Sequence, residues 1–326
     1  MASDDFHRYA RRVRLRLALL MALLVAAAVA AVWHLQSTIP RKIVLASGVK
    51  DASYHQDAQR YAAILARHGV QVVERMTGGA GENATLIVDP RSGIDVAFME
   101  GGVVAPADRE KVAMLAALRY EPVWVFYRGD EVLTRLDQLR YKRVAVGTPG
   151  NGGRVIVEPL LTASNVTDSN TKLLPIGGYA ALRALQDGEI DADVIVGAPR
   201  SPIVWQALHD ERLKLMSFAD ADAYARRFPY ITPLSLPAGT IDMSYRRIPP
   251  ETVRLIATRT MLVARDELPT ALANLMLDAA VELHSGQGYF EAAREFPSTA
   301  PVDLPVDAEA DRHLRFGPNL LHRYLP

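Results

Sequence analysis

The sequence predicts an α/β protein built from two parallel-sheet lobes, because one pattern occurs in it twice. A basic dipeptide opens a short apolar strand at Arg41-Lys42 and again at Lys142-Arg143. Each strand leads into a small polar loop, a helix-like stretch, a second strand, another helix and a closing strand that is first acidic and then apolar. The closing strands are Ile94–Phe98 and Ile190–Val196. Each repeat therefore predicts a βαβαβ unit.

Two such units create a cleft at the carboxyl ends of their strands, where open α/β sheets bind ligands. We expect the first lobe to be discontinuous, over residues 41–125 and 230–300, and the second to span 126–229. The apolar segment 112–128 is expected to carry strands that cross between the lobes. A chain that crosses out and back is hinged at those crossings.

The remaining segments follow from periodicity and from breaking residues. Pro229, Pro233 and Pro237 predict an extended return segment, because proline does not fit inside a helix. Residues 301–326 form a proline-rich C-terminal tail. The expected strand is Gln71–Met76, and the expected helices are Tyr54–His68, Glu82–Val88, Glu251–Val263 and Thr270–His284.

Composition excludes several classes of function. Lys plus Arg and Asp plus Glu each number 37, so there is no basic excess of the kind that nucleic-acid binding requires. Without cysteine there is no thiol catalysis, disulfide or zinc–thiolate site. The sequence holds neither an H-E-x-x-H nor a G-x-S-x-G motif, so we expect no metal, no cofactor and no enzyme. We interpret the pair Asp191 and Asp193 as solvated.

The N-terminus predicts a membrane anchor. Leu17 to Trp33 contains no charged side chain, and five arginines precede it within residues 1–16. A spanning helix needs about 17 to 25 apolar residues, and the positive-inside rule leaves the arginines in the cytoplasm. We therefore favour a single uncleaved anchor over 17–34, with the body outside. A cleaved signal peptide is the alternative, with Ala28-Val29-Ala30 as its cleavage motif.

The loop from Gly147 to Arg154 is the strongest candidate for ligand contact. Its glycines let backbone N–H groups approach a ligand, and the start of the following helix favours an anion. The Arg154 guanidinium could add a bidentate contact to a carboxylate. The alternative is an ordinary glycine-rich turn between a strand and a helix.

Other loops should reach the same cleft. Thr77 to Asn83 is a second glycine-rich turn, and Tyr54 could stack on a ligand or donate from its hydroxyl. Glu100-Gly101-Gly102 and Gly197-Ala198-Pro199 follow the closing strands and should form the cleft walls. Simple turns and helix starts are again the alternatives.

At these loops the chain resembles the TAXI family, the solute-binding proteins of one branch of TRAP transporters. A loop of the type T-x-G-[SA]-x-E-N is represented by Thr77 to Asn83, and G-x-P-G-S-G-[ST] by Gly147 to Gly153, with Asn151 and Gly153 where hydroxyl residues are usual. A strand ending G-F-x-Q corresponds to Ala97-Phe98-Met99-Glu100. The similarity covers roughly residues 42 to 245.

The resemblance implies a periplasmic-binding-protein type II fold and a receptor that captures a small carboxylate, often glutamate-like, for a TRAP-type permease. With the anchor, it places the body in the periplasm, tethered to the inner membrane. An anchored sensory or partner-binding module without transport is the alternative. The expected ligand-binding residues are Tyr54, Gly79, Asn83, Glu100, Thr148, Gly150, Asn151, Arg154 and Pro199.

Overall fold

The computed structural model describes residues 16–27, 41–50 and 52–317. Residues from Lys42 to Gly317 form one unit, and the N-terminal residues belong to another. Within the N-terminal unit, 16–27 are helical and exposed. Among the residues described, no helix has both the length and the apolar character needed to cross a bilayer. Residues 28–34 of the predicted anchor, and Asp51, lie outside the described ranges.

Both repeats fold as predicted into three parallel strands with helices between them. In each repeat the first strand pairs with the other two. The first block contains β1 (Lys42–Ala46), α2 (Ser53–Ala66), β2 (Gln71–Arg75), α3 (Ala80–Val88) and β3 (Val96–Glu100). The second block contains β5 (Arg143–Ala145), α4 (Gly152–Ala163), β6 (Lys172–Leu174), α5 (Gly178–Asp187) and β7 (Ala192–Val196).

Two long antiparallel strands join the blocks into one mixed sheet of order β2-β1-β3-β10-β4-β7-β5-β6. They are β4 (Val112–Tyr127) and β10 (Val253–Arg265). The crossing strand at 112–128 is thereby confirmed, whereas the helix predicted over Glu251–Val263 is wrong. Residues in β10 pair with strands on both sides, and this pairing, with burial of nearly every side chain, overrides the local helical pattern.

One hydrogen bond repeats in both blocks and ties each acidic closing strand to its first strand. The Val44 N–H donates to Asp95 Oδ2 over 2.8 Å, and the Arg143 N–H donates to Asp191 Oδ2 over 2.7 Å. The acidic residue that repeats in the sequence therefore makes the same hydrogen bond in both blocks. Asp193, two residues further along β7, is only 1% exposed, so its interpretation as a solvated residue is wrong.

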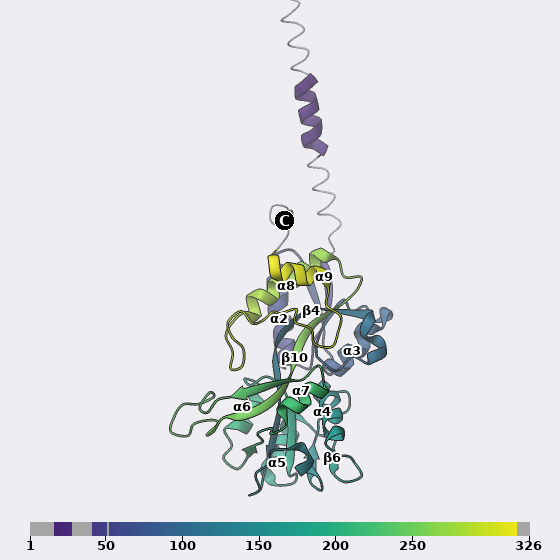
Figure 1. Ribbon diagram of the computed structural model, residues 1–326. Coiled ribbons are helices and arrows are strands. Elements are labelled where there is room, and N and C mark those ends of the chain that lie inside the picture. Colours follow the sequence, from purple (N-terminus) through teal and green to yellow (C-terminus); the bar gives the residue numbers. More distant parts are fainter. Residues whose placement is uncertain (1–15, 28–40, 51, 318–326) are drawn as a thin grey trace, which may run out of the picture. The chain divides into compact units, whose positions relative to one another are not determined.

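The C-terminal part packs on the first block. In Figure 1, α8 and α9 lie together at the end of the body that holds α2 and α3. Val302 and Leu304 are buried, and Val306 bridges to Met114, so the described part of the predicted tail belongs to this core. The other helices are α6 (Pro202–Leu208), α7 (Ala221–Arg227), α8 (Thr270–His284) and α9 (Ala308–Phe316), and the 3-10 turns are Pro90–Ser92, Pro106–Lys111 and Leu136–Leu139. The short strands are β8 (Lys214–Leu215) and β9 (Thr232–Leu236), and β9 confirms the extended return segment.

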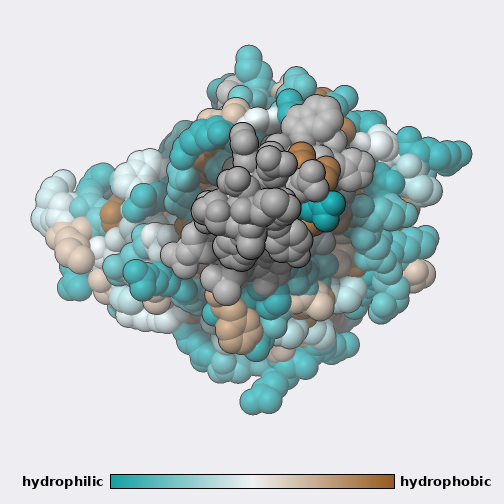
Figure 2. All heavy atoms as spheres, turned by 90° about the horizontal axis from the view of Figure 1, so that it is seen from above, coloured by the Kyte–Doolittle hydropathy of each residue, from teal (hydrophilic) through white to brown (hydrophobic). Residues whose placement is uncertain are grey.

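Apolar side chains of both blocks fill one continuous core around the sheet. Its largest members include Trp124 and Phe126 from β4 and Tyr61 from α2. Around the atoms drawn in grey, the face shown in Figure 2 is largely hydrophilic with scattered apolar residues. Scattered apolar residues on a surface are ordinary, whereas polar side chains buried within the body are unusual.

Candidate functional site

The two blocks touch where α3 and α4 begin. A Cβ atom on Gly81 would lie 2.5 Å from the Gly150 carbonyl oxygen. A Cβ on Gly152 would lie 2.6 Å from both the Ala80 Cβ and Glu100 Oε2. Glycine is therefore required for this close approach. We call this contact region, at the carboxyl ends of the parallel strands, the junction.

A second set of contacts closes the junction on other sides. The Tyr230 ring would lie 2.8 Å from a Cβ on Gly102, so this ring packs flat against the end of β3. The Arg200 guanidinium, which follows β7, lies 5.0 Å from the Tyr289 ring centre, which follows α8. Residues that follow β3 and β7 thus make close contacts with other parts of the body, and ligand contact by Glu100 and Pro199 stays a prediction.

Three buried polar groups lie together beside this contact: the Tyr54 hydroxyl and the Glu100 carboxyl, which interact with each other, and Arg119 Nη2, which has no hydrogen-bond partner. They come from the start of α2, the end of β3 and the middle of β4. The Arg119 guanidinium carbon lies 5.9 Å from the centre of the Tyr54 ring. Buried polar groups are nearly always hydrogen-bonded, so a polar cluster in which Arg119 Nη2 has no partner is unusual inside a core. We call Tyr54, Asp57, Glu100, Arg119 and Glu121 the junction cluster.

Within the junction cluster, Arg119 is fixed by two carboxylates. It forms ion pairs with Asp57 and with Glu121, the latter over 2.9 Å. The Thr260 hydroxyl on β10 donates to Glu121 Oε1 over 2.8 Å. Although burial opposes the charge, these two carboxylates raise the pKa of Arg119 further above its ordinary value. The guanidinium is therefore a permanent cation with one free edge.

Glu100 differs because no cation pairs with it. Burial, reinforced by the charge of Glu121, raises the pKa of Glu100 to about 7. Burial also raises the pKa of Tyr54, with Glu100 and Glu121 adding to the effect. The hydroxyl of Tyr54 is thus a neutral donor or acceptor, and the Glu100 carboxyl can exist in either protonation state near neutral pH.

Asn83 and Gly79 serve the architecture of the junction. The Asn83 amide donates to the Ser47 and Phe98 carbonyls over 2.6 and 2.7 Å and accepts from the Thr77 hydroxyl. These bonds hold the ends of β1, β2 and β3 together and use both amide protons. Gly79 caps α3 with φ 118°. Direct ligand contact by these two residues stays a prediction.

The loop predicted to bind the anion lies at the edge of the junction. Thr148, Gly150 and Asn151 are exposed, and Asn151 accepts from the Gly153 N–H as the cap of α4. The Arg154 guanidinium donates to Glu158 over 2.7 Å and to the Gly147 carbonyl over 3.3 Å. Contact between this arginine and an anion would therefore compete with Glu158. Its predicted role stays a prediction.

Sequence reasoning missed Arg119, Glu121 and Asp57. A signal existed, because Arg119 and Glu121 are charged residues inside the apolar segment 112–127 and two positions apart, hence on one face of a strand. Asp57 could not be found in this way, because a polar residue on an amphipathic helix is ordinarily on its outer face.

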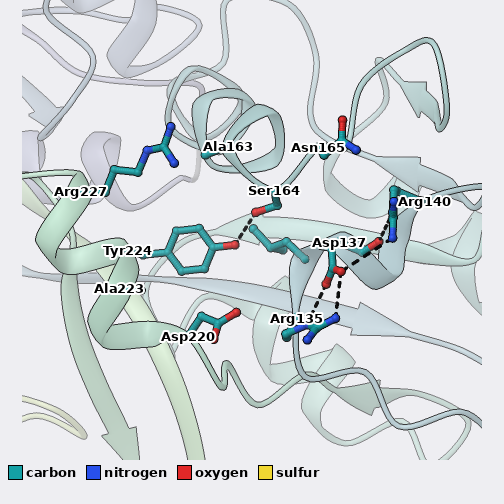
Figure 3. Close-up of a pocket in the computed structure, with 11 residues that line it drawn as sticks. Arg135, Asp137, Arg140, Ala163, Ser164, Asn165, Asp220, Ala223, Tyr224 and Arg227 are labelled. Carbon is teal, nitrogen blue, oxygen red and sulfur yellow. Dashed lines mark hydrogen bonds and ion pairs between the residues drawn. The ribbon is translucent and has the colours of Figure 1, made fainter.

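A separate groove of about 510 Å³ lies in the second block, between Leu136–Leu139, α4 and α7. In Figure 3 several of its polar groups pair with one another: Tyr224 bonds Ser164, and Asp137 pairs with Arg135 and Arg140. Among its described lining residues, none has a buried polar atom left without a partner, as Arg119 has at the junction. Among the residues that the structure describes, no group of three or more acidic or histidine side chains could hold a metal ion.

Several solved binding proteins resemble the chain at low sequence identity. An ancestral arginine-binding protein with bound arginine matches at 13% identity and a TM-score of 0.46, covering 76% of this chain and 95% of its own. The effector-binding domain of QuiR in complex with shikimate matches at 8% and 0.47, covering 76% and 98%. The periplasmic aliphatic sulphonate binding protein SsuA from Escherichia coli matches at 11% and 0.46, covering 74% of each chain. These likenesses are too distant to transfer a ligand.

The family model carries more weight, because it matches residues 58–292. This range runs from α2 to beyond α8 and includes the whole second block, both long strands and most of the junction cluster. The chain therefore belongs to the NMT1-like family.

Proposed function

We propose that this protein is a solute-binding receptor that captures a small ligand at the junction between its two blocks. The observation that carries this proposal is the buried polar cluster at the junction, in which Arg119 Nη2 has no partner and the Tyr54 hydroxyl and Glu100 carboxyl face each other. These groups would form hydrogen bonds with a polar solute. In a closed site from which water is excluded, such bonds give both affinity and selectivity.

The finer proposal is a receptor for a small carboxylate that serves a TRAP-type permease. The free edge of Arg119 and the Tyr54 hydroxyl are suitable donors for a carboxylate. The loop Gly147 to Arg154 could add backbone donors when the blocks move apart and close again. We also propose that residues 17–34 anchor the protein in the inner membrane with its body in the periplasm. No catalytic role is proposed.

An anchored sensory or partner-binding module is the alternative function, because it would use the same junction and the same anchor. The two can be separated by measuring uptake. Loss of the protein should abolish accumulation of the solute if it is a transport receptor, and should leave accumulation unchanged if it only reports the solute to a partner.

Ligand capture itself is tested by a thermal-shift screen of the purified full-length protein in detergent. The library should contain organic acids, amino acids, sulfonates, sugars and amines. A solute at a hundred times its Kd should stabilise the folded protein by about 2.7 kcal/mol. If no class of solute raises the unfolding temperature, the proposed function is wrong.

A further inference from the structure

The charges of the junction cluster do not balance. Asp57, Glu100 and Glu121 are three carboxyl groups, and Arg119 is the cation buried among them; the exposed Arg60 side chain pairs with Asp57 at 4.0 Å. Asp57 and Glu121 both hold Arg119, and Thr260 completes the bonding of Glu121. Glu100 is left without an ion-pair partner, and the side chain that it faces is the neutral Tyr54 hydroxyl.

The groups packed around Glu100 cannot supply the missing positive charge. Tyr54 from α2 is neutral, and its pKa is raised further by burial. From β4 come Glu121, which repels a second carboxylate, and Arg119, whose attraction is shared with its two partners. From α3 and α4 come the backbone and small side chains of Ala80 and Gly152.

A buried carboxylate without a counter-ion is costly, so it either takes up a proton or acquires a cation from outside. We propose that the ligand brings this cation: it bears a positively charged nitrogen, such as an ammonium group, that binds Glu100. This inference rests on the proposed function and names the chemical class of its solute. The free edge of Arg119 and the Tyr54 hydroxyl then hold an oxygen of the same molecule.

Binding of a cationic group at Glu100 should change the protonation of this carboxyl. Glu100 has a pKa of about 7 in the free protein, so it is partly protonated at neutral pH. A cationic nitrogen binds the ionised form, and binding therefore releases a proton. Because the competent fraction falls as Glu100 takes up its proton, the affinity should drop roughly tenfold between pH 8 and pH 6.

The experiment uses full-length protein in detergent and pairs of solutes that differ in one ammonium group. The pairs are L-alanine and propionate, L-glutamate and glutarate, and 6-aminohexanoate and hexanoate, beside amines, sugars and sulfonates. We expect the solute that binds best to carry a cationic nitrogen. Its amine-free analogue should bind ten- to a hundredfold more weakly, roughly the range for a hydrogen bond to a charged group.

The Glu100→Gln variant keeps the shape of the side chain and removes its charge. It should lose a similar factor in affinity for the amine-bearing solute and lose the pH dependence. Calorimetry at pH 6 in buffers of different ionisation enthalpy should show nearly one proton released by the wild-type protein and none by Glu100→Gln. Asp193→Asn, which alters a buried carboxyl away from the junction, is the matched control and should bind normally.

The possible outcomes separate this inference from the proposed function. If the best solute lacks a cationic nitrogen, or if Glu100→Gln binds an amine-bearing solute as well as the wild type does, the inference is overturned and the receptor function stands. If no solute of any class binds, the receptor function itself fails.

Discussion

The two blocks share one connectivity but contribute different chemistry to the junction. In the first block, the strand ends are tied together by Asn83, and beside them the buried polar groups of Glu100 and Tyr54 face each other. In the second block, the corresponding loop after β5 is exposed from Thr148 to Asn151 and meets the first block through glycine backbone. The comparison shows polar side chains fixed in the first block and a close backbone contact from the second.

This division explains why charged residues can be kept inside the body. Burying the Glu100 carboxyl without a counter-ion costs free energy. The surrounding hydrogen bonds of Asn83 and the ion pairs of Arg119 fix the positions of these groups. A rigid first block can therefore keep a costly site ready, whereas the second block needs only to approach without a steric clash.

The largest effect is expected from the buried carboxyl of the second block. Burial raises the pKa of Asp193 to about 7 from 3.8, so its contribution to stability is fully present below about pH 4 and is lost as the pH rises through 7. The loss could reach about 4 kcal/mol at 1.36 kcal/mol per unit. The free energy of unfolding, measured with urea, should fall between pH 5 and pH 8 in the wild-type protein. It should fall less in Asp193→Asn.

Asp191→Asn is the control for this prediction. Its hydrogen bonds to the Arg143 side chain lower the pKa of Asp191, so its contribution has the opposite sign and is lost as the pH falls. If the stability of Asp193→Asn depends on pH as that of the wild type does, the Asp193 carboxyl is hydrogen-bonded or in contact with solvent.

The next largest effect tests the rigidity of the first block. Asn83→Ala removes three buried hydrogen bonds and leaves the Ser47 and Phe98 carbonyls with fewer donors. At about 1 kcal/mol for each bond, the free energy of unfolding should fall by roughly 3 kcal/mol. A loss below about 1 kcal/mol in urea unfolding would mean that the strand ends are not held together by this residue.

Closure by the second block should depend on Gly152. An added Cβ would overlap Ala80 and Glu100, so Gly152→Ala should fold normally but bind the solute at least about tenfold more weakly, or 1.4 kcal/mol. Gly286→Ala is the matched control, because nothing lies within 4 Å of the added atom. Equal affinities for the two variants, measured by calorimetry, would contradict close approach of the blocks in the bound state.

The smallest effect belongs to the exposed loop. Asn151 caps α4 through one hydrogen bond to the Gly153 N–H. Asn151→Ala should therefore lower stability by about 1 kcal/mol, the usual cost of losing a helix cap. If thermal unfolding shows Asn151→Ala to be as damaging as Asn83→Ala, the two blocks are equally rigid and the comparison between them fails.

Much of the architecture could be predicted because its signals are local. The acidic residue before each closing strand, Asp95 or Asp191, made the repeat visible, and the structure gives both the same contact. Strand β10 was mistaken for a helix because its identity depends on pairing with β3, β4 and β9. Asp57 and Arg119 meet across 62 positions of sequence, so their ion pair requires the folded structure.

The candidate site was predicted in outline only. Tyr54 and Glu100 could be chosen because they follow strands of a recognisable repeat. The role of Arg119 in the site could not be predicted from the sequence. It depends on the two carboxylates that bind the guanidinium and leave one of its edges free. In the same way, the engagement of Arg154 by Glu158 depends on side-chain geometry within α4.

We propose above that a solute binds at the junction cluster, and removal of the Tyr54 hydroxyl is the sharpest test of this binding site. Tyr54 and Tyr61 both lie on α2 and both pack on Phe98, but the Tyr54 hydroxyl faces Glu100, whereas the Tyr61 ring lies against His284. Calorimetry with the best solute of the screen should show roughly tenfold weaker binding to Tyr54→Phe, about 1.4 kcal/mol, and unchanged binding to Tyr61→Phe. Unchanged affinity in Tyr54→Phe, or an equal loss in both variants, would contradict the account.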